Sequence, residues 1–221
     1  MKRRFAWMLL AGLLLMANPV LAEPTPDEVI AAIKKLGGKV TVDGNKAAIT
    51  VRLGFSKITD AGLEHLKGLT NLELLIIRHT KVTDAGLVHL KGLTKLEGLG
   101  FTNTNVTDAG LVHLEGLTRL ERLWLTRTKI TDAGLAHLKG LTKLEGLNLS
   151  NTKVTDAGLV HLKEMTGLKG LGLWNTQVTD AGLVHLKGLT KLEELGLRNT
   201  QITDAGAKKL QQVLPKCKIA R

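Results

Sequence analysis

Residues 93–116 read LTKLEGLGFTNTNVTDAGLVHLEG, and close copies of this stretch fill most of the 221-residue chain. Its tetrapeptide Thr-Asp-Ala-Gly occurs seven times at a constant interval of 24 residues, starting at Thr59, Thr83, Thr107, Thr131, Thr155, Thr179 and Thr203. A unit of this length cannot enclose its own apolar face, so successive units must stack. The period therefore predicts a solenoid that presents one long surface rather than an enclosed pocket.

The apolar spacing changes within each unit. Leu99 and Phe101 alternate with polar or small residues, which is the period of a strand. Leu111 and Leu114 are three residues apart, which is the period of a helix. Each unit is therefore predicted to be a short strand, a turn, and a short helix that returns to the next strand.

The residues at the helix ends agree with this prediction. We expect Thr107 to cap the helix with its hydroxyl and Asp108 to place negative charge at its positive end. We expect Gly116 to end the helix in the left-handed conformation. Gly110 lies inside the first helical turn, where glycine costs about 1 kcal/mol relative to alanine. We interpret this repeated glycine as the site of a close approach, in which adjacent helices pack backbone to backbone.

A family resemblance rests on the whole pattern, Leu-x-x-Leu-x-x-Leu-x-Leu-x-x-Thr-x-Val-Thr-Asp-Ala-Gly-Leu-x-x-Leu, over about residues 47–213. This pattern resembles the leucine-rich repeat, in the subclass with Thr-Asp-x-Gly-Leu after the strand that is similar to ribonuclease-inhibitor-like and F-box-associated repeats. The resemblance implies an α/β solenoid, a curved right-handed arc with parallel strands on its concave face and short helices on its convex face. It also implies a bacterial, secreted protein.

One column departs from that subclass. Relatives often place cysteine or asparagine after the strand, whereas this chain has a hydroxyl at each position: Ser56, Thr80, Thr104, Thr128, Thr152, Thr176 and Thr200. A hydroxyl can bond to nearby turn backbone, so we expect a ladder of such bonds to replace the usual side chain.

Both ends of the array are predicted to be caps, because a solenoid would otherwise expose its core there. At the N-terminal side, residues 23–46, Thr25-Pro26-Asp27-Glu28 forms a capping box that predicts a helix over about 26–36. The alternating segments 39–42 and 47–53 then predict a hairpin. At the C-terminal side, with its cap at residues 214–221, the closing apolar residues are Leu210, Val213, Leu214, Cys217 and Ile219.

Residues 1–22 are predicted to be a signal peptide. A basic start, Lys2 to Arg4, precedes the apolar run Phe5 to Met16, and the segment finishes in a small residue, Ala22. This is typical of a secretory signal cut after about Ala22, and the run is too short to span a membrane. An uncleaved N-terminal anchor is the alternative. In either case the repeats are predicted to be secreted or periplasmic, without integral membrane contact once the signal is cleaved.

Charge gives a second hypothesis about partners. The net charge is +11, and removal of residues 1–22 takes away three positive charges and no negative ones, which leaves +8. Such a balance favours anionic partners. Most lysines, however, recur at fixed repeat positions, so we interpret them as a solvated face and predict no nucleic-acid partner. One such column, which Glu115 interrupts, is predicted to lie on the convex face and consists of Lys67, Lys91, Lys139, Lys163 and Lys187.

The sequence offers little support for metal or catalytic chemistry. A histidine column stands 24 residues apart, at His65, His89, His113, His137, His161 and His185. Helices pack 8–10 Å apart and a zinc–nitrogen bond is about 2 Å long, so these histidines are poorly placed to share an ion. No nucleophile motif is present, and we predict neither an enzyme nor a cofactor. The single cysteine, Cys217, is interpreted as a buried cap residue, with redox chemistry or dimer formation as the alternative.

Variation between repeats is concentrated on the strands. Two of the four aromatic residues beyond the signal peptide, Trp124 and Trp174, are predicted to face the concave side. Tryptophan and arginine are enriched at binding hot spots. Strands two repeats apart are separated by about 10 Å, so one ligand could contact both tryptophans. The candidate binding residues are Leu74, Ile76, Arg78, Arg122, Trp124, Arg127, Trp174, Glu194 and Arg198.

The favoured hypothesis is thus a protein that binds another protein or macromolecule through these residues. Two alternatives stay open. The concave residues can be incidental drift on a glycine-rich floor, and the chain can be a passive envelope component that associates with anionic polymers through its convex lysines.

Overall fold

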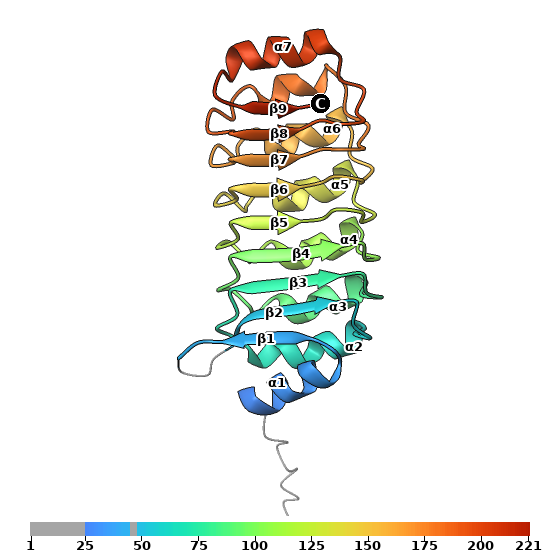
Figure 1. Cartoon of the computed structure of the whole chain (residues 1–221), viewed down its shortest axis with the longest axis vertical. Helices are drawn as coiled ribbons and strands as arrows, with labels where there is room; N and C mark the ends of the chain where they lie inside the picture. The colour runs from blue at the N-terminus through green and yellow to red at the C-terminus, as the bar shows by residue number, and fades with distance from the viewer. Residues whose placement is uncertain (1–24, 45–47) are drawn as a thin grey trace, which may run out of the picture.

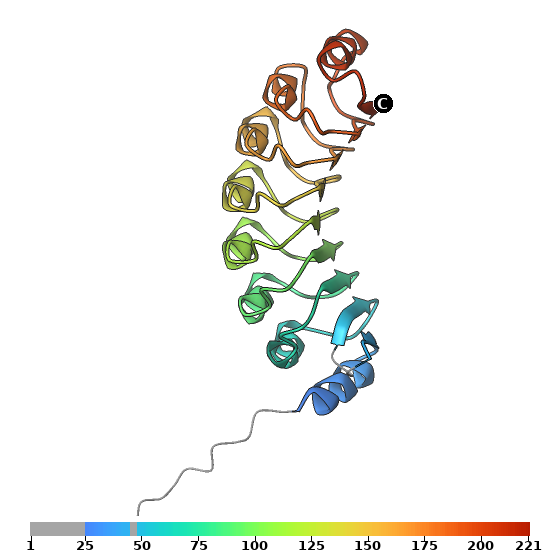
Figure 2. The same ribbon diagram turned by 90° about the vertical axis from the view of Figure 1, so that its left-hand side faces the viewer.

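A computed structural model describes residues 25–44 and 48–221, so the predicted signal peptide lies outside the described residues. The chain forms a nine-stranded sheet in which the strands follow one another in sequence order (Figure 1). The sheet lies on the inner side of an arc and the short helices lie on the outer side (Figure 2). The predicted solenoid, with strands on its concave face and helices on its convex face, is confirmed.

The register of the sheet matches the 24-residue repeat. β2 to β9 are parallel, each residue pairs with the residue 24 positions later, and β1 is antiparallel to β2. Each column of the repeat therefore runs straight across the sheet. The strands are β1 (Lys39–Val42), β2 (Ala48–Gly54), β3 (Leu74–Arg78), β4 (Gly98–Thr102), β5 (Arg122–Trp124), β6 (Gly146–Asn148), β7 (Gly170–Gly172), β8 (Glu194–Gly196) and β9 (Lys218–Ala220).

Most convex segments begin with one α-helical turn and continue as a 3₁₀ helix. Between these segments and the sheet lies a single leucine core, in which Leu99, Phe101, Leu111 and Leu114 are fully buried. Burying each leucine side chain stabilises the fold by about 1.5–3 kcal/mol. The convex segments are α2 (Asp60–Leu63) with η1 (Glu64–Gly68), α3 (Asp84–Leu87) with η2 (Val88–Leu90), α4 (Asp108–Leu111) with η3 (Val112–Leu114), α5 (Asp132–Leu135) with η4 (Ala136–Leu138), α6 (Asp156–Leu159) with η5 (Val160–Leu162), and η6 (Gly182–Leu186).

The N-terminal end is covered by α1 (Pro26–Lys35), whose predicted capping box is present. The backbone N–H of Thr25 donates to Glu28 Oε2 at 2.8 Å, and the backbone N–H of Glu28 donates to Thr25 Oγ1 at 3.4 Å. Val29, Ile30 and Ile33 on this helix are buried. The apolar face of α1 thus closes the first repeat.

The C-terminal end is covered by α7 (Asp204–Val213) and β9. Cys217 is buried, as predicted, and this burial raises the pKa of its thiol to about 11, so the thiol is protonated at neutral pH. The expectation for Val213 was wrong, because its side chain is 48% exposed at the last position of α7. Leu210 and Leu214 supply the buried contacts instead.

The left-handed backbone conformation, which the sequence predicted for Gly116 at the end of the helix, occurs instead in the turn after each strand. Seven residues in one column have φ between 54° and 58°, namely Phe55, His79, Asn103, Arg127, Asn151, Asn175 and Asn199. Among the described glycines only Gly37 has positive φ, so the prediction for Gly116 was wrong. The convex segment ends instead in a 3₁₀ bond from Leu117 N to Leu114 O, at 2.9 Å.

The predicted hydroxyl ladder is confirmed. Thr104 Oγ1 donates to the carbonyl of Phe101 at 2.9 Å, and the equivalent bond in the next repeat runs from Thr128 Oγ1 to Leu125 O at 2.6 Å. The bond is present at six of the seven positions, whereas Thr80 Oγ1 instead accepts from the backbone N–H of Val82 at 3.4 Å. The hydroxyl thus takes the structural place of the usual cysteine or asparagine.

An aspartate ladder joins successive repeats on the convex side. Asp84 Oδ1 accepts from Thr107 N at 2.7 Å, and Asp84 Oδ2 accepts from Thr107 Oγ1 at 2.6 Å. The same pair of bonds recurs from Asp60 through Asp180. A Cβ atom on Gly110 would lie 2.5 Å from Asp84 Oδ1. The interpretation of backbone-to-backbone helix packing was therefore wrong, because the glycine makes room for the carboxylate of the preceding repeat.

The last step of this ladder makes stability depend on pH. The hydroxyl and the backbone N–H of Thr203 hold the pKa of the Asp180 carboxyl below its ordinary value of 3.8. Because the folded-state pKa is lowered, the carboxylate stabilises the fold above the ordinary value and loses this contribution as pH falls through the folded value. We expect the free-energy gap between wild type and Asp180→Asn to be full near neutral pH and to shrink below about pH 4. Urea unfolding across a pH series measures the gap, and a gap that stays constant into the acid range would contradict the expectation.

Candidate concave binding site

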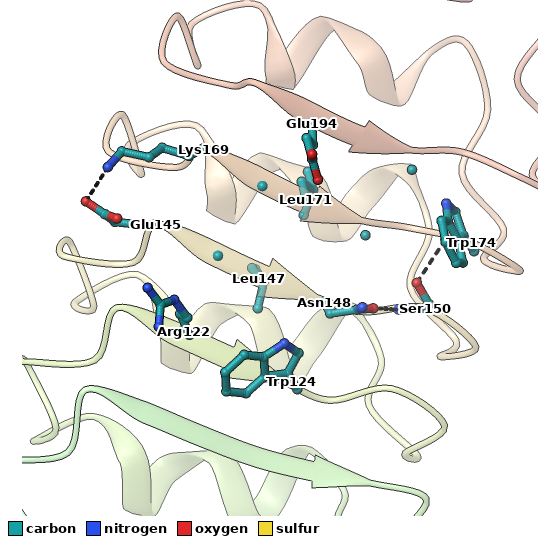
Figure 3. A pocket seen from close by; sticks show the side chains of 14 residues that line it. Arg122, Trp124, Glu145, Leu147, Asn148, Ser150, Lys169, Leu171, Trp174 and Glu194 are labelled. Carbon is teal, nitrogen blue, oxygen red and sulfur yellow. Dashed lines mark hydrogen bonds and ion pairs between the residues drawn. The ribbon is translucent and has the colours of Figure 1, made fainter. Parts of the chain in front are cut away.

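The concave strands carry a groove of about 450 Å³ (Figure 3). Four of the predicted residues line it, with Arg122 and Trp124 on β5, Trp174 just after β7, and Glu194 on β8. Polar residues that the sequence had not singled out complete the lining, namely Glu145, Asn148, Ser150 and Lys169. The two tryptophans thus share one surface depression, although they come from different repeats.

The constant register arranges the groove in rows that run across the strands. The first row is Arg122, Gly146, Gly170 and Glu194, and the second is Trp124, Asn148, Gly172 and Gly196. Trp174 lies two residues beyond Gly172, in a third row with Ser150. The tryptophans therefore stand two repeats apart in adjacent rows, with Asn148 and Ser150 between them (Figure 3).

The tryptophan rings lean toward opposite ends of the groove. Trp124 is half-buried, and its ring atoms lie 3.5–3.6 Å from where Cβ atoms of Gly98 and Gly100 would be. Trp174 is 44% exposed, and a Cβ on Gly196 would overlap its indole. The backbone N–H of Trp174 donates to Ser150 Oγ at 3.2 Å. Because each ring covers glycines on its outer side, the middle of the groove stays open.

The floor glycines fall into two kinds. Side chains of neighbouring repeats occupy the space beside Gly98 and Gly172, where a Cβ would lie 2.5 Å from Leu74 Cδ1 and 2.8 Å from Asn148 Oδ1, respectively. At Gly170 a Cβ would meet nothing within 4 Å, and at Gly146 it would make only an ordinary contact with Arg122. Internal packing thus explains the first kind, whereas the second leaves free space in the groove.

One wall of the groove carries an ion pair. Lys169 Nζ lies 2.8 Å from Glu145 Oε1, and this contact lowers the pKa of Glu145 and raises the pKa of Lys169. The sequence signal for the pair is that Lys169 replaces the glutamate found at this repeat position in the neighbouring units. Arg122 and Glu194 are exposed, and no hydrogen bond or ion pair joins either side chain to another described residue.

Comparisons with known proteins identify the repeat. A leucine-rich-repeat family profile matches residues 140–162 and 188–210. The chain therefore carries leucine-rich repeats. A comparison with curated proteins finds no match.

Solved structures of bacterial proteins resemble this leucine-rich-repeat protein over much of its length. An internalin C2 from Listeria monocytogenes is 27% identical with a TM-score of 0.67, and the match covers 90% of this chain and 87% of that one. An internalin from the same organism, named inlF, is 25% identical with a TM-score of 0.55, over 71% of this chain and 49% of that one. A leucine-rich-repeat protein from Leptospira interrogans is 23% identical with a TM-score of 0.56, over 71% and 39%, which shows the fold alone. The fold is thus internalin-like, whereas these matches do not address the ribonuclease-inhibitor-like subclass.

The remaining predicted residues of the leucine-rich-repeat protein lie outside the groove. Leu74 and Ile76 are half-buried on β3 and pack over the glycines of β4 on the side away from Trp124. Arg78 is exposed at the end of β3, where its side chain lies beside Gly54. Arg198 is exposed beyond β8, and Arg127 is exposed in the turn beyond β5. Leu74 and Ile76 extend the apolar surface, but the three arginines contribute nothing to the groove lining.

Replacing Arg127 tests the account of the seven left-handed residues that follow the strands. Four of its seven members are asparagine, and Asn175 and Asn199 donate to Asn151 and Asn175 at 3.1 and 2.8 Å. Asparagine tolerates left-handed backbone better than arginine does. We expect Arg127→Asn to raise the unfolding free energy by about 0.5–1 kcal/mol in denaturant titrations. Partner binding at the groove should not change, and a destabilised variant would contradict this account of the turn.

A second hollow, of about 580 Å³, follows the turns of the first repeats and is lined in part by His79 and Asn103. Beside it the ring of Phe55, which is 74% exposed, stacks on His79 with ring centroids 4.3 Å apart. Asn103 Nδ2 lies 2.9 Å from His79 Nδ1. Phe55 and His79 both have left-handed backbone. The turns of the first repeats therefore carry aromatic rings at the position where the turns of later repeats carry asparagine.

The convex face carries the lysine column, whose five members are all exposed. Where Glu115 interrupts the column, its Oε1 lies 2.8 Å from His137 Nδ1. Burial and the neighbouring Lys91 lower the pKa of His113. No group of three or more His, Cys, Asp or Glu side chains in residues 25–44 and 48–221 is placed to hold a metal ion. Within the same ranges, no helix is both long and apolar enough to cross a membrane.

Proposed function

We propose that this leucine-rich-repeat protein binds a protein partner through the concave groove between Trp124 and Trp174. The observation that carries the proposal is the pairing of two accessible tryptophans with an open glycine floor and two unpaired charges on one face. Aromatic and arginine side chains supply most of the energy at protein interfaces. A large aromatic surface left partly in water is stabilised when a partner covers it.

The proposed role is non-enzymatic. The groove offers no nucleophile beside a general base, and its one close carboxylate–amine contact, between Glu145 and Lys169, is an exposed ion pair. A binding role also fits a solenoid, because a solenoid presents a long open surface rather than an enclosed cavity.

We place this role outside the cytoplasm, in the secreted or periplasmic compartment. The support is the signal-like composition of residues 1–22 and the likeness to internalins. The N-terminal sequence of the protein recovered from its native compartment tests the placement. A chain that begins at Glu23 is the expected result, and a chain retaining residues 1–22 in the cytoplasm would contradict it.

A double variant, Trp124→Ala with Trp174→Ala, tests the groove. The matched control changes two exposed convex residues, Val112→Ala with Lys139→Ala. A partner captured from the extracytoplasmic fraction should be purified and titrated against all three proteins. We expect the groove variant to bind at least about tenfold more weakly and the convex variant to bind like wild type. Equal affinity for the groove variant, or loss in the convex variant, would refute the proposal.

A second candidate function is association with anionic polymers through the convex lysines. It is favoured by the exposure of Lys67, Lys91, Lys139, Lys163 and Lys187 along one face. Retention on an immobilised anionic polysaccharide should then fall steeply with salt. It should also fall when three of these lysines become glutamine, whereas the tryptophan variant should be retained like wild type. The reverse pattern would exclude this candidate.

A further inference from the structure

We propose that the groove binds an extended peptide segment that runs across β5 to β8. This segment carries an acidic and a basic side chain four residues apart. This inference rests on the proposed function and adds the chemistry and the orientation of the partner segment. The segment lies along the row Arg122, Gly146, Gly170 and Glu194. Its acidic side chain meets Arg122 and its basic side chain meets Glu194.

The first step of the argument is the charge at the two ends of the row. Arg122 and Glu194 are exposed, and no hydrogen bond or ion pair connects either of them to another side chain in the described ranges. Their nearest charged neighbours differ in this respect, because Glu145 and Lys169 already neutralise each other. Lys218 on β9 is the register partner of Glu194, and Arg122 acts on Glu145 from a distance, but neither contact is a hydrogen bond or ion pair in the described ranges. The row therefore presents a cation and an anion without a direct partner, which complements a segment with both signs.

The second step is the space between those charges. Of the concave glycines, Gly98, Gly100, Gly172 and Gly196 have neighbouring side chains over them, whereas Gly170 has none within 4 Å. A Cβ on Gly146 would touch only the stem of Arg122, at 3.7 Å. Neither the turn nor the packing of this chain requires glycine at these two positions. The free strip between the charges thus has room for the backbone and a side chain of another molecule.

The third step is length. Arg122 and Glu194 are three strands apart, which corresponds to about 14 Å at 4.8 Å per strand. An extended peptide rises about 3.3 Å per residue, so about four residues cover this distance. Side chains at positions i, i+2 and i+4 of an extended segment point to the same side. The two charged residues and one residue between them can therefore all face the floor.

The tryptophans set the character of the middle residue. Trp124 in the second row and Trp174 in the third row both lie on the same side of the open strip, where they form a partly apolar wall (Figure 3). The middle position over Gly146 and Gly170 therefore suits an apolar side chain, while the alternate residues face solvent.

The test is a specificity switch in the full chain. A display library with a randomised five-residue core is selected with wild type, Arg122→Glu, Glu194→Lys, and the Trp124→Ala Trp174→Ala variant. We expect wild type to enrich an acid and a base four residues apart by about tenfold over cores with the charges three apart. Arg122→Glu should enrich cores with bases at both positions, and Glu194→Lys should enrich cores with acids at both positions. An unfolded variant would lose binding without changing preference, so a switch cannot arise from misfolding.

The outcomes separate the two proposals. If wild type enriches no core over the tryptophan variant, the peptide inference fails, whereas the proposed function is decided separately by titrating the captured partner against the Trp124→Ala Trp174→Ala variant. If cores are enriched in a tryptophan-dependent way but show no paired charges, only the charge-reading inference fails. Charge preferences that remain unchanged in Arg122→Glu and Glu194→Lys would also overturn it.

Discussion

Replacing Gly110 with alanine is expected to lower the free energy of unfolding by about 2–4 kcal/mol, although alanine is favoured over glycine in a helix by about 1 kcal/mol. The new methyl group would lie 2.5 Å from Asp84 Oδ1. The carboxylate would have to move and would weaken its bonds to Thr107 N and Thr107 Oγ1. Hydrogen bonds to a charged group contribute about 1.5–3 kcal/mol each, which sets the scale of the loss. Urea unfolding monitored by circular dichroism measures it.

Two comparisons show whether the carboxylate is the cause. Gly116→Ala lies in the same repeat with nothing within 4 Å of the added methyl, so we expect a change within about 0.5 kcal/mol. In an Asp84→Ala background, Gly110→Ala should cost much less than in wild type, because the obstructing oxygen is gone and only Leu87 Cδ2, 3.0 Å from the added methyl, still has to shift. If the loss persists in that background, helix contact rather than the aspartate ladder requires this glycine.

The framework of the fold was predictable because its signals are local. Strand period at Leu99 and Phe101, helix period at Leu111 and Leu114, and the capping box at Thr25 each lie within one short segment. The role of Asp84 was not predictable in this way. Its partner Thr107 is 23 residues away, and the two meet only when the repeats stack in register. A period identifies such columns, but only the stacked structure shows which columns touch.

The sequence contained an indication of the left-handed turn that our prediction did not use. Four of the seven residues in that column are asparagine, the side chain that best tolerates positive φ. Gly116 instead suggested a helix end, because glycine commonly ends α-helices. The convex segments finish as 3₁₀ helices, whose last bond to Leu117 needs no left-handed residue. The helix type, rather than the glycine, decides the geometry at that point.

The sequence predicted which repeat positions contribute to the candidate site, but not how far the groove extends or which residues line it. Trp124, Trp174, Arg122 and Glu194 stand out as departures from the repeat, and the structure brings these four together. Glycines look identical as letters, however, and only neighbouring side chains distinguish Gly170 from Gly196. The Glu145–Lys169 pair required knowing that their strands are adjacent.

Replacing Gly170 with leucine is expected to weaken partner binding at the groove by at least about tenfold while leaving the fold intact. The leucine side chain would fill the open strip between Arg122 and Glu194, where this chain places no atom within 4 Å of the added Cβ. The fold already accepts leucine in this column, because Leu74 occupies the equivalent position on β3. A strand glycine is also conformationally costly, so we expect the unfolding free energy to stay within about 0.5 kcal/mol of wild type or to rise. Titration of the captured partner and urea unfolding measure the two effects separately.

The matched variant is Gly196→Leu, which lies on the neighbouring strand β8 in the second row of the same groove. Its side chain would collide with the Trp174 indole, so we expect both stability and binding to fall. The contrast between Gly170→Leu and Gly196→Leu shows whether the open glycine strip of the groove contacts the partner. Loss of binding in Gly170→Leu at full stability means that the open strip receives the partner. Full binding in Gly170→Leu would show that the partner contacts only the tryptophan-lined walls, and the glycine floor would then be incidental to function.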